Sequence, residues 1–175
     1  MREPRATRRL FFALQPNSEV IKAINRATRS AVVRSEGRAV RDENLHITVA
    51  FLGNVDEERQ ARAAHAPPVA IEPFDLEFGR LGFWPRGRIL WLEPFTVPVN
   101  LSKLEQGLRS YLADLGFSLE TRPYRPHVTL ARKAQAVTGD TPAVRWRVRQ
   151  LALVESVQIA GGVRYMPLQS WPLQP

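Results

Sequence analysis

The 175-residue sequence contains no cysteine. This absence excludes disulfide bonds and thiolate metal sites, and it fits a protein of the cytoplasm, which is where we expect the chain to be located. The sequence also lacks any apolar run long enough to span a membrane. The apolar stretch that follows the basic N-terminus is too short for the core of a secretory signal. We therefore expect no association with a membrane.

Acidic residues are fewer than basic ones, with 17 Asp and Glu against 25 Lys and Arg, and the formal net charge is +8. A basic surface attracts polyanions, of which nucleic acid is the commonest. Most of the basic residues are arginines, so a general compositional bias toward arginine explains the excess equally well. Charge alone leaves both interpretations open. The length suits one domain, residues 1–175, and a composition that is 44% hydrophobic is sufficient for a core.

Histidine is also scarce, because the chain has only His46, His65 and His127. Two of the three stand in the same short context, His-x-Thr followed by aliphatic residues, in "NLHITVAFLG" (44–53) and "RPHVTLAR" (125–132). A single His-x-Thr is best explained by local hydrogen bonding. Two copies that hold two of the three histidines favour a functional pair. The remaining histidine, His65, lies in an alanine-rich segment and is expected on the surface.

Both copies are predicted to be strands. Side chains alternate between the two faces of a strand, so His46 and Thr48 share one face, and His127 and Thr129 do the same. The opposite face of the first copy is wholly apolar and is expected to face the core; it consists of Leu45, Ile47, Val49 and Phe51.

The hydrophobic pattern predicts a repeated architecture. Strands are expected at 8–16, 45–53, 74–85, 87–94 and 125–132, with a final hairpin that pairs 145–160 with 163–173 around Gly161 and Gly162. Helices are expected after a cap at Asn17 or Ser18, at 56–66, and at 101–115 with Gly116 as the C-terminal cap. The order strand, helix, His-x-Thr strand thus occurs twice. This repetition predicts two similar lobes that face each other across a cleft.

Two His-x-Thr walls that meet in a cleft would suit a phosphate group. Histidine titrates near neutrality, with an ordinary pKa of about 6.5, so one imidazole can accept a proton while the other donates one. Threonine hydroxyls can donate hydrogen bonds to phosphate oxygens. No carboxylates accompany the histidines at metal-ligand spacing, so a metal site is not expected.

Several segments together resemble the bacterial RNA 2′,3′-cyclic phosphodiesterases, also called LigT-like 2′-5′ RNA ligases, of the 2H phosphoesterase superfamily. The segments are "RLFFALQP", "NLHITVAFLG", "RPHVTLAR" and the tail "ESVQIAGGVRYMPLQSWPL". The resemblance implies an α+β, bilobal fold with two pseudo-symmetric lobes, each with an antiparallel sheet flanked by helices, and an active-site cleft between them. It also implies hydrolysis of a terminal 2′,3′-cyclic phosphate on RNA to a 2′-phosphate, without metal or other cofactor.

The resemblance assigns roles to five residues of this sequence. His46 matches the general acid of the first motif, and His127 matches the general base of the second. Thr48 and Thr129 match the hydroxyls that contact the phosphate, and Arg132 matches a basic residue that follows the second motif. Strict alternation places Arg132 on the face opposite His127, so this residue reaches the phosphate only if the strand bends or ends near Ala131, or if its long side chain curls round.

The residues leave several alternatives open. If the 5′-hydroxyl of a second RNA replaced water, the same groups would form a 2′-5′ linkage. The substrate could instead be a small cyclic nucleotide such as ADP-ribose 1″,2″-cyclic phosphate. A third alternative is a module that binds single-stranded RNA through arginines and the aromatic residues Trp84, Trp91 and Tyr124. The partner expected first is an RNA with a cyclic phosphate end, such as a tRNA fragment, and the protein is expected to bind it as a monomer. Residues 54–86 match no motif, and this region is a candidate substrate-specific loop.

Overall fold

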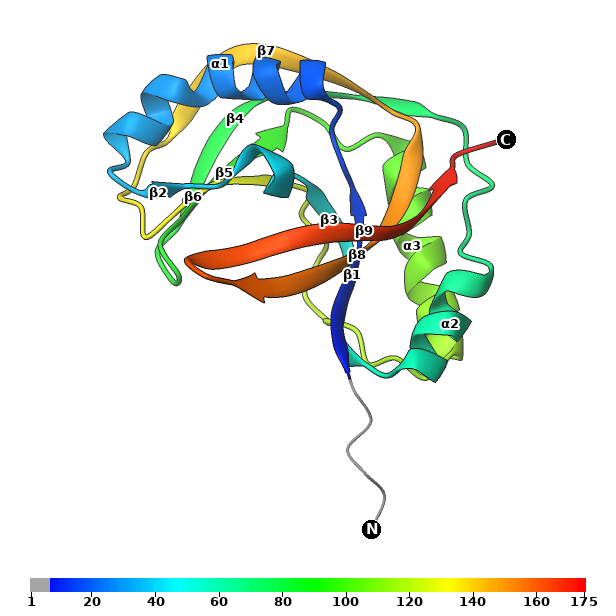
Figure 1. Cartoon of the computed structure of the whole chain (residues 1–175). Helices are drawn as coiled ribbons and strands as arrows, with labels where there is room; N and C mark the ends of the chain where they lie inside the picture. The colour runs from blue at the N-terminus through cyan, green and yellow to red at the C-terminus, as the bar shows by residue number, and fades with distance from the viewer. Residues whose placement is uncertain (1–6) are drawn as a thin grey trace.

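The structure, a computed structural model, describes residues 7–175; residues 1–6, which begin the basic N-terminus, lie outside the described residues. The fold is α+β, with two antiparallel sheets and three α-helices in the described part of the chain, so the predicted class is confirmed (Figure 1). The first sheet has the order β3 (Ile47–Val55), β1 (Arg8–Leu14), β8 (Gln150–Ile159), β9 (Gly162–Pro172). The second has the order β2 (Arg38–Ala39), β6 (Val128–Arg132), β5 (Ile89–Pro94), β4 (Phe74–Trp84), β7 (Gly139–Val148).

The helices are α1 (Ser18–Arg34), α2 (Glu57–His65) and α3 (Val99–Asp114), with a short 3₁₀ turn, η1, at Asp42–Asn44. The predicted cap of α1 is confirmed, since the Asn17 side chain accepts a hydrogen bond from the backbone nitrogen of Val20 at 2.9 Å. The predicted stop at Gly116 is confirmed too. Gly116 has φ of +80°, and the backbone nitrogen of the next residue donates to the carbonyl of Leu112 at 3.0 Å. This pattern closes α3 with a left-handed glycine cap.

The predicted repeat is present as β1–α1–β3 and β5–α3–β6. In each copy the first strand pairs antiparallel with the His-x-Thr strand. The helices, however, cross over: α1 packs against β7 and β6 of the second sheet, whereas α3 packs against β3 of the first. The helix of each repeat therefore packs on the sheet that contains the strands of the other repeat. This exchange fixes the position of the two His-x-Thr strands relative to each other.

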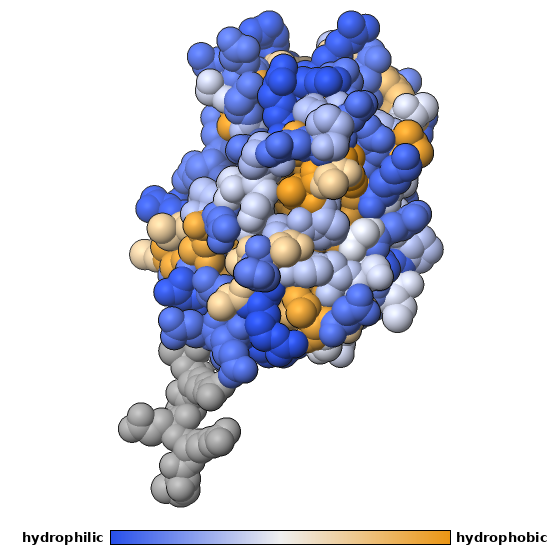
Figure 2. All heavy atoms as spheres, turned by 90° about the vertical axis from the view of Figure 1, so that its right-hand side faces the viewer, coloured by the Kyte–Doolittle hydropathy of each residue, from blue (hydrophilic) through white to orange (hydrophobic). Residues whose placement is uncertain are grey.

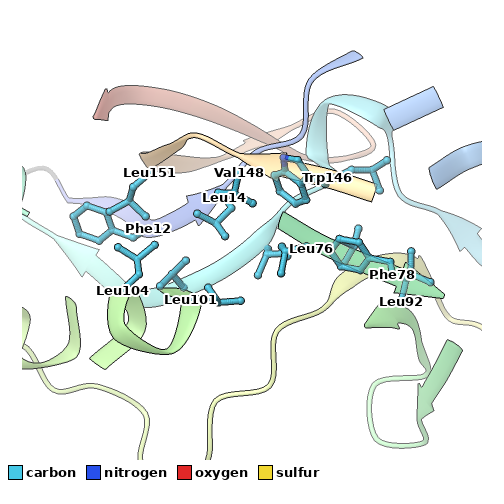
Figure 3. Close-up of a cluster of buried hydrophobic side chains, with 14 of the residues drawn as sticks. Phe12, Leu14, Leu76, Phe78, Leu92, Leu101, Leu104, Trp146, Val148 and Leu151 are labelled. Atoms are coloured by element: carbon cyan, nitrogen blue, oxygen red, sulfur yellow. The ribbon is translucent and has the colours of Figure 1, made fainter. Parts of the chain in front are cut away.

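The two sheets and α3 share one hydrophobic core (Figure 3). Figure 3 shows side chains of β1, β4, β5, α3, β7 and β8 pointing toward one another; the labelled residues are Phe12, Leu14, Leu76, Phe78, Leu92, Leu101, Leu104, Trp146, Val148 and Leu151. Full burial of one such Leu or Phe side chain contributes roughly 1.5–3 kcal/mol. The surface on the side of the molecule where α2 and α3 lie is mostly hydrophilic, and its hydrophobic residues form separate patches (Figure 2).

The end of the chain corrects one sequence prediction. Residues 145–160 do not form one strand, because β7 ends at Val148 in the second sheet and β8 begins at Gln150 in the first. The alternation of buried and exposed residues changes phase here, since Arg149 and Gln150 are both exposed between the buried Val148 and Leu151. The chain switches sheets at this point. The predicted hairpin of β8 with β9 is confirmed, while β2 and η1 were not predicted.

Candidate active site

A β-bulge follows the threonine of the first His-x-Thr motif. Thr48 lies opposite Ala13 of β1, but Ala50 lies opposite Phe12, so two residues of β3 span one step of β1. Val49 is the extra residue. A bulge of this kind bends its strand and interrupts the alternation of side chains between the two faces.

The second motif has the same bulge at the same place. Thr129 lies opposite Trp91 of β5, and Ala131 lies opposite Leu90, so Leu130 is the extra residue. The two repeats therefore agree in register, in strand pairing and in the position of the irregularity.

These bulges explain where the third residue after each threonine lies. Phe51, predicted to face the core, is 42% exposed and lines the cavity next to the histidines, so that prediction is wrong. Arg132, which strict alternation places away from His127, lines the same cavity. Ala131, on the other hand, is fully buried in the core. In both strands the extra residue re-aims the side chains that follow it.

All five residues singled out from the sequence meet in one cavity of about 250 Å³. Its lining includes His46, Thr48, His127, Thr129 and Arg132, which come from the ends of β3 and β6. The third histidine of the chain is on α2, exposed and outside this lining, as expected.

The two histidines are oriented by matching hydrogen bonds. Nδ1 of His46 lies 2.7 Å from the carbonyl oxygen of Asn44, and Nδ1 of His127 lies 2.8 Å from that of Arg125. A carbonyl oxygen can only accept, so each Nδ1 carries the proton. In the neutral rings Nε2 is thus left as the acceptor. The Thr48 hydroxyl, 2.9 Å from Nε2 of His46, donates to it.

Aromatic side chains brace both imidazoles. Phe11 of β1 and Tyr165 of β9 lie against His46, with ring centroids 5.1 and 4.9 Å away. Trp84, at the end of β4, meets His127 edge to face at 4.5 Å. Sequence reasoning did not assign these roles. Phe11 and Tyr165 lie within the quoted "RLFFALQP" and tail segments, but only the pairing of β1 with β3 and of β8 with β9 brings them to the histidine.

Both histidine pKa values are lowered. Burial lowers the pKa of His46 from 6.5 to about 4; its bond to the Asn44 carbonyl opposes this shift, and the nearby His127 and Arg132 add to it. The pKa of His127 is also lowered, first by burial and then by the positive charges of Arg125 and Arg132, against its bond to the Arg125 carbonyl. Both imidazoles are therefore neutral near pH 7, and a charge on His127 opposes protonation of His46.

The residues from 7 to 175 contain no cluster of three or more His, Cys, Asp or Glu side chains that could hold a metal ion. No helix in this part of the chain is both long and apolar enough to cross a membrane.

Two His-x-Thr strands bring paired imidazoles, hydroxyls and an arginine to one small cavity, a set of groups of the kind that phosphoesterases use. Residues 16–158 match the family model of the 2′-5′ RNA ligase superfamily, and the chain belongs to this family.

Named relatives match most of the chain. The RNA 2′,3′-cyclic phosphodiesterase of Escherichia coli is 36% identical over 177 residues, which cover 99% of either chain. That of Aeropyrum pernix is 33% identical over 129 residues, which cover 70% of this chain and 72% of the relative. The crystal structure of E. coli LigT complexed with 3′-AMP has a TM-score of 0.87 and 34% identity, and the match covers 97% of this chain and all of that one.

Proposed function

We propose that the chain is an RNA 2′,3′-cyclic phosphodiesterase, a hydrolase that opens the terminal cyclic phosphate of RNA to a 2′-phosphate without a metal. The observation that carries the proposal is the shared cavity of His46 and His127, each with Nδ1 tied to a carbonyl and Nε2 left for proton transfer. Membership of the family and the curated relatives named for this activity support it.

The reaction needs one group that accepts a proton from the attacking water and another that donates a proton to the leaving oxygen. Water attacks phosphorus, and Nε2 of His127 accepts the proton that this water loses. The bond from phosphorus to the 3′ oxygen breaks on the opposite side, and the departing oxygen takes a proton from Nε2 of His46. The 2′ ester bond is retained, which gives the 2′-phosphate. These roles follow the family resemblance, because the two imidazoles are alike in their hydrogen bonds.

Before this step His46 must gain a proton, although burial lowers its pKa. The negative charge of the bound phosphate supplies the driving force, because an anion within a few ångströms favours the charged imidazolium. Protonation of Nε2 also removes the acceptor that the Thr48 hydroxyl uses. That hydroxyl is then free to donate to a phosphate oxygen. Thr129 and Arg132 offset the charge on the remaining oxygens.

The test of the proposal is the loss of activity in His46→Ala and His127→Ala, with His65→Ala as a matched control from the same chain. Each cavity variant should lose roughly 10²–10⁴-fold in turnover of an oligonucleotide 2′,3′-cyclic phosphate while remaining folded. The exposed control should behave like the wild type. Near-wild-type turnover by either cavity variant would contradict the proposal.

The proposed substrate is an RNA end, for example that of a tRNA fragment, acted on by a monomer in the cytoplasm. The net charge of +8 supports an extended anionic substrate. The Michaelis constant for an oligonucleotide should then rise steeply with salt, while that for a cyclic mononucleotide changes little. Equal salt dependence would favour a small cyclic nucleotide as the substrate. Ligation would use the same groups, with a 5′-hydroxyl in place of water.

A further inference from the structure

The residue two positions before each of the two cavity histidines is anchored by its own side chain. The backbone carbonyl of Asn44 accepts the Nδ1 proton of His46 at 2.7 Å. The backbone carbonyl of Arg125 does the same for His127 at 2.8 Å. An imidazole oriented by a carbonyl is only as fixed as the backbone that carries the carbonyl. The contacts of these two anchoring side chains therefore bear on the geometry of the site.

The two anchors differ in charge. The Asn44 side chain is a neutral amide that bonds the backbone of β9, donating to the carbonyl of Val163 at 2.7 Å and accepting from the nitrogen of Tyr165 at 2.9 Å. The Arg125 side chain instead bonds Glu93 of β5, with Nε 2.9 Å from Oε2 and Nη2 3.3 Å from Oε1. Paired bonds between a guanidinium and a carboxylate restrict the orientation of both groups. The second anchor is thus an ion pair where the first is an amide.

Glu93 and Arg125 are each held by a second contact. Glu93 is buried, and its Oε1 also lies 3.6 Å from Nη1 of Arg80 on β4. The guanidinium carbon of Arg125 lies 4.5 Å from the ring centroid of Trp91, in a cation–π contact. The Arg125 side chain is 54% exposed, so without these partners it would be free to adopt other rotamers. The ion pair and the indole together fix the residue whose carbonyl orients His127.

The register of the second sheet brings Glu93 close to His127. Strands β5 and β6 are antiparallel, with Leu92 opposite Val128. Continued by one residue, this register places Glu93 across from His127, and residues directly opposite each other share a face of the sheet. The carboxylate is therefore a neighbour of the imidazole as well as the partner of Arg125.

This carboxylate sets the surroundings of the two histidines apart. Burial lowers the pKa of His127, and the charges of Arg125 and Arg132 lower it further, whereas Glu93 raises it. The charges that act on His46, those of His127 and Arg132, both lower its pKa. The charged or titratable groups around His127 come from the preceding loop and from three strands; they are Arg125, Glu93 of β5, Arg132 of β6 and His46 of β3. Trp84 of β4 contacts the ring as well and carries no charge.

We propose that Glu93 is a positioning residue for His127: it holds Arg125, whose carbonyl orients the imidazole, and it balances the positive charge that Arg125 brings beside that ring. The proposal rests on the proposed phosphodiesterase function. It supplies a structural reason for His127, and not His46, to accept the proton from water, because a nearby carboxylate makes an imidazole the stronger base.

The test is a pair of substitutions with opposite expected effects on His127. Glu93→Gln keeps the size of the side chain but leaves the charge of Arg125 without this carboxylate, so the pKa of His127 should fall. Arg125→Gln keeps the backbone carbonyl and leaves the carboxylate without the guanidinium, so the pKa of His127 should rise. The chain has three histidines, so NMR titration of their Hε1 protons follows each one, with the exposed His65 as the internal reference.

Asp75→Asn is the matched control for Glu93→Gln. It also removes one carboxylate from β4–β5–β7 of the second sheet, and it also breaks a pair with arginine, since Nη1 of Arg147 lies 2.8 Å from Oδ2 of Asp75. Neither residue lines the cavity of the two histidines. The titration of His127 and the turnover of this variant should match those of the wild type.

Turnover separates positioning from substrate binding. Glu93→Gln should lower kcat by roughly ten- to 10²-fold, which is the cost of a small displacement of a reacting group. The Michaelis constant should change little, because Glu93 does not line the cavity. Glu93→Asp restores the charge on a shorter side chain, so it should return the titration of His127 toward that of the wild type and recover part of kcat.

The inference would be overturned if the pKa of His127 moved in the same direction in Glu93→Gln and Arg125→Gln, if it stayed at the wild-type value in both, or if Glu93→Gln kept the wild-type kcat. Should Glu93→Gln not fold, an unchanged or lowered pKa of His127 in Arg125→Gln would contradict the inference by itself. Failure of the proposed function is a separate result, because the wild type would then hydrolyse no cyclic phosphate, whereas the titration is measured without substrate.

Discussion

Phe51 and Arg132 occupy equivalent positions in the two repeats, each three residues after the threonine of its motif and each just beyond a one-residue bulge. Both line the cavity that contains the two histidines. One repeat thus contributes an aromatic surface at the position where the other contributes a cation. Two nearly symmetric strands thus make a site in which the two histidines are alike and the neighbouring side chains differ.

Arg132→Ala should have two effects. Loss of a positively charged donor should reduce turnover by roughly 10²–10³-fold, as for other groups that stabilise developing negative charge. Arg132 also lowers the pKa of both histidines, so its removal should move the pH optimum of kcat/KM upward. Arg132→Lys retains the charge and should keep the wild-type optimum while losing the paired geometry of the guanidinium. An unchanged optimum in Arg132→Ala would show that this residue does not act on the histidines.

The pH dependence of the wild type should differ between kcat/KM and kcat. The first reports the free enzyme, in which both histidine pKa values lie below 6.5, so its bell-shaped profile should have its maximum below pH 6.5. The second reports the complex, in which the bound phosphate anion raises both pKa values. The maximum of kcat should therefore lie at a higher pH. If kcat and kcat/KM had their maxima at the same pH, the charge of the bound substrate would not raise the pKa values of the two histidines.

The assignment of acid and base can be tested with a substrate in which sulfur replaces the 3′ oxygen. A thiolate leaves without much help from an acid, so His46→Ala should recover a large part of its lost rate with this substrate. His127→Ala should not recover, because activation of water is unaffected by the leaving group. Rescue of His127→Ala in place of His46→Ala would reverse the two roles.

Gly82 leaves room for the indole of Trp91, which lies across from it in the sheet. A Cβ at Gly82 would stand 1.9 Å from Cη2 of Trp91, so Gly82→Ala should destabilise the fold by ~1–3 kcal/mol. The substitution should also displace Trp84, whose ring centroid lies 5.4 Å from that of Trp91. Gly107→Ala in α3 is the control, because its nearest neighbour would be at 3.5 Å. It should gain ~0.5–1 kcal/mol from helix propensity. Urea unfolding of the two variants should show opposite signs; equal stabilities would contradict the close packing.

The sequence predicted the elements that depend on local pattern. The caps at Asn17 and Gly116, the two His-x-Thr strands and the repeat that contains them are properties of short segments, and each is present. The bulges at Val49 and Leu130 were not predictable in this way. A residue is extra only in comparison with the strand it pairs with. The exposed position of Phe51 therefore depends on the pairing of β3 with β1, and the alternation of apolar residues within β3 does not show it.

The surroundings of the histidines needed the tertiary structure for the same reason. Tyr165 reaches His46 because the side chain of Asn44 accepts from the backbone nitrogen of Tyr165 and donates to the carbonyl of Val163, at 2.9 and 2.7 Å. These contacts join residues about 120 positions apart in sequence. The crossover of α1 and α3 to opposite sheets could not be predicted for a similar reason. The apolar face of an amphipathic helix can pack on either sheet, and the sequence of the helix does not show which one.

The most direct test of the account is the position of the phosphate in the product. An oligonucleotide with a 2′,3′-cyclic phosphate end is incubated with the enzyme in excess EDTA, and the product is identified by phosphorus NMR. The account predicts full turnover and a 2′-phosphate, because two imidazoles carry both proton transfers and the 3′ oxygen leaves beside His46. A 3′-phosphate, or turnover that stops in EDTA and returns with one added divalent ion, would contradict it.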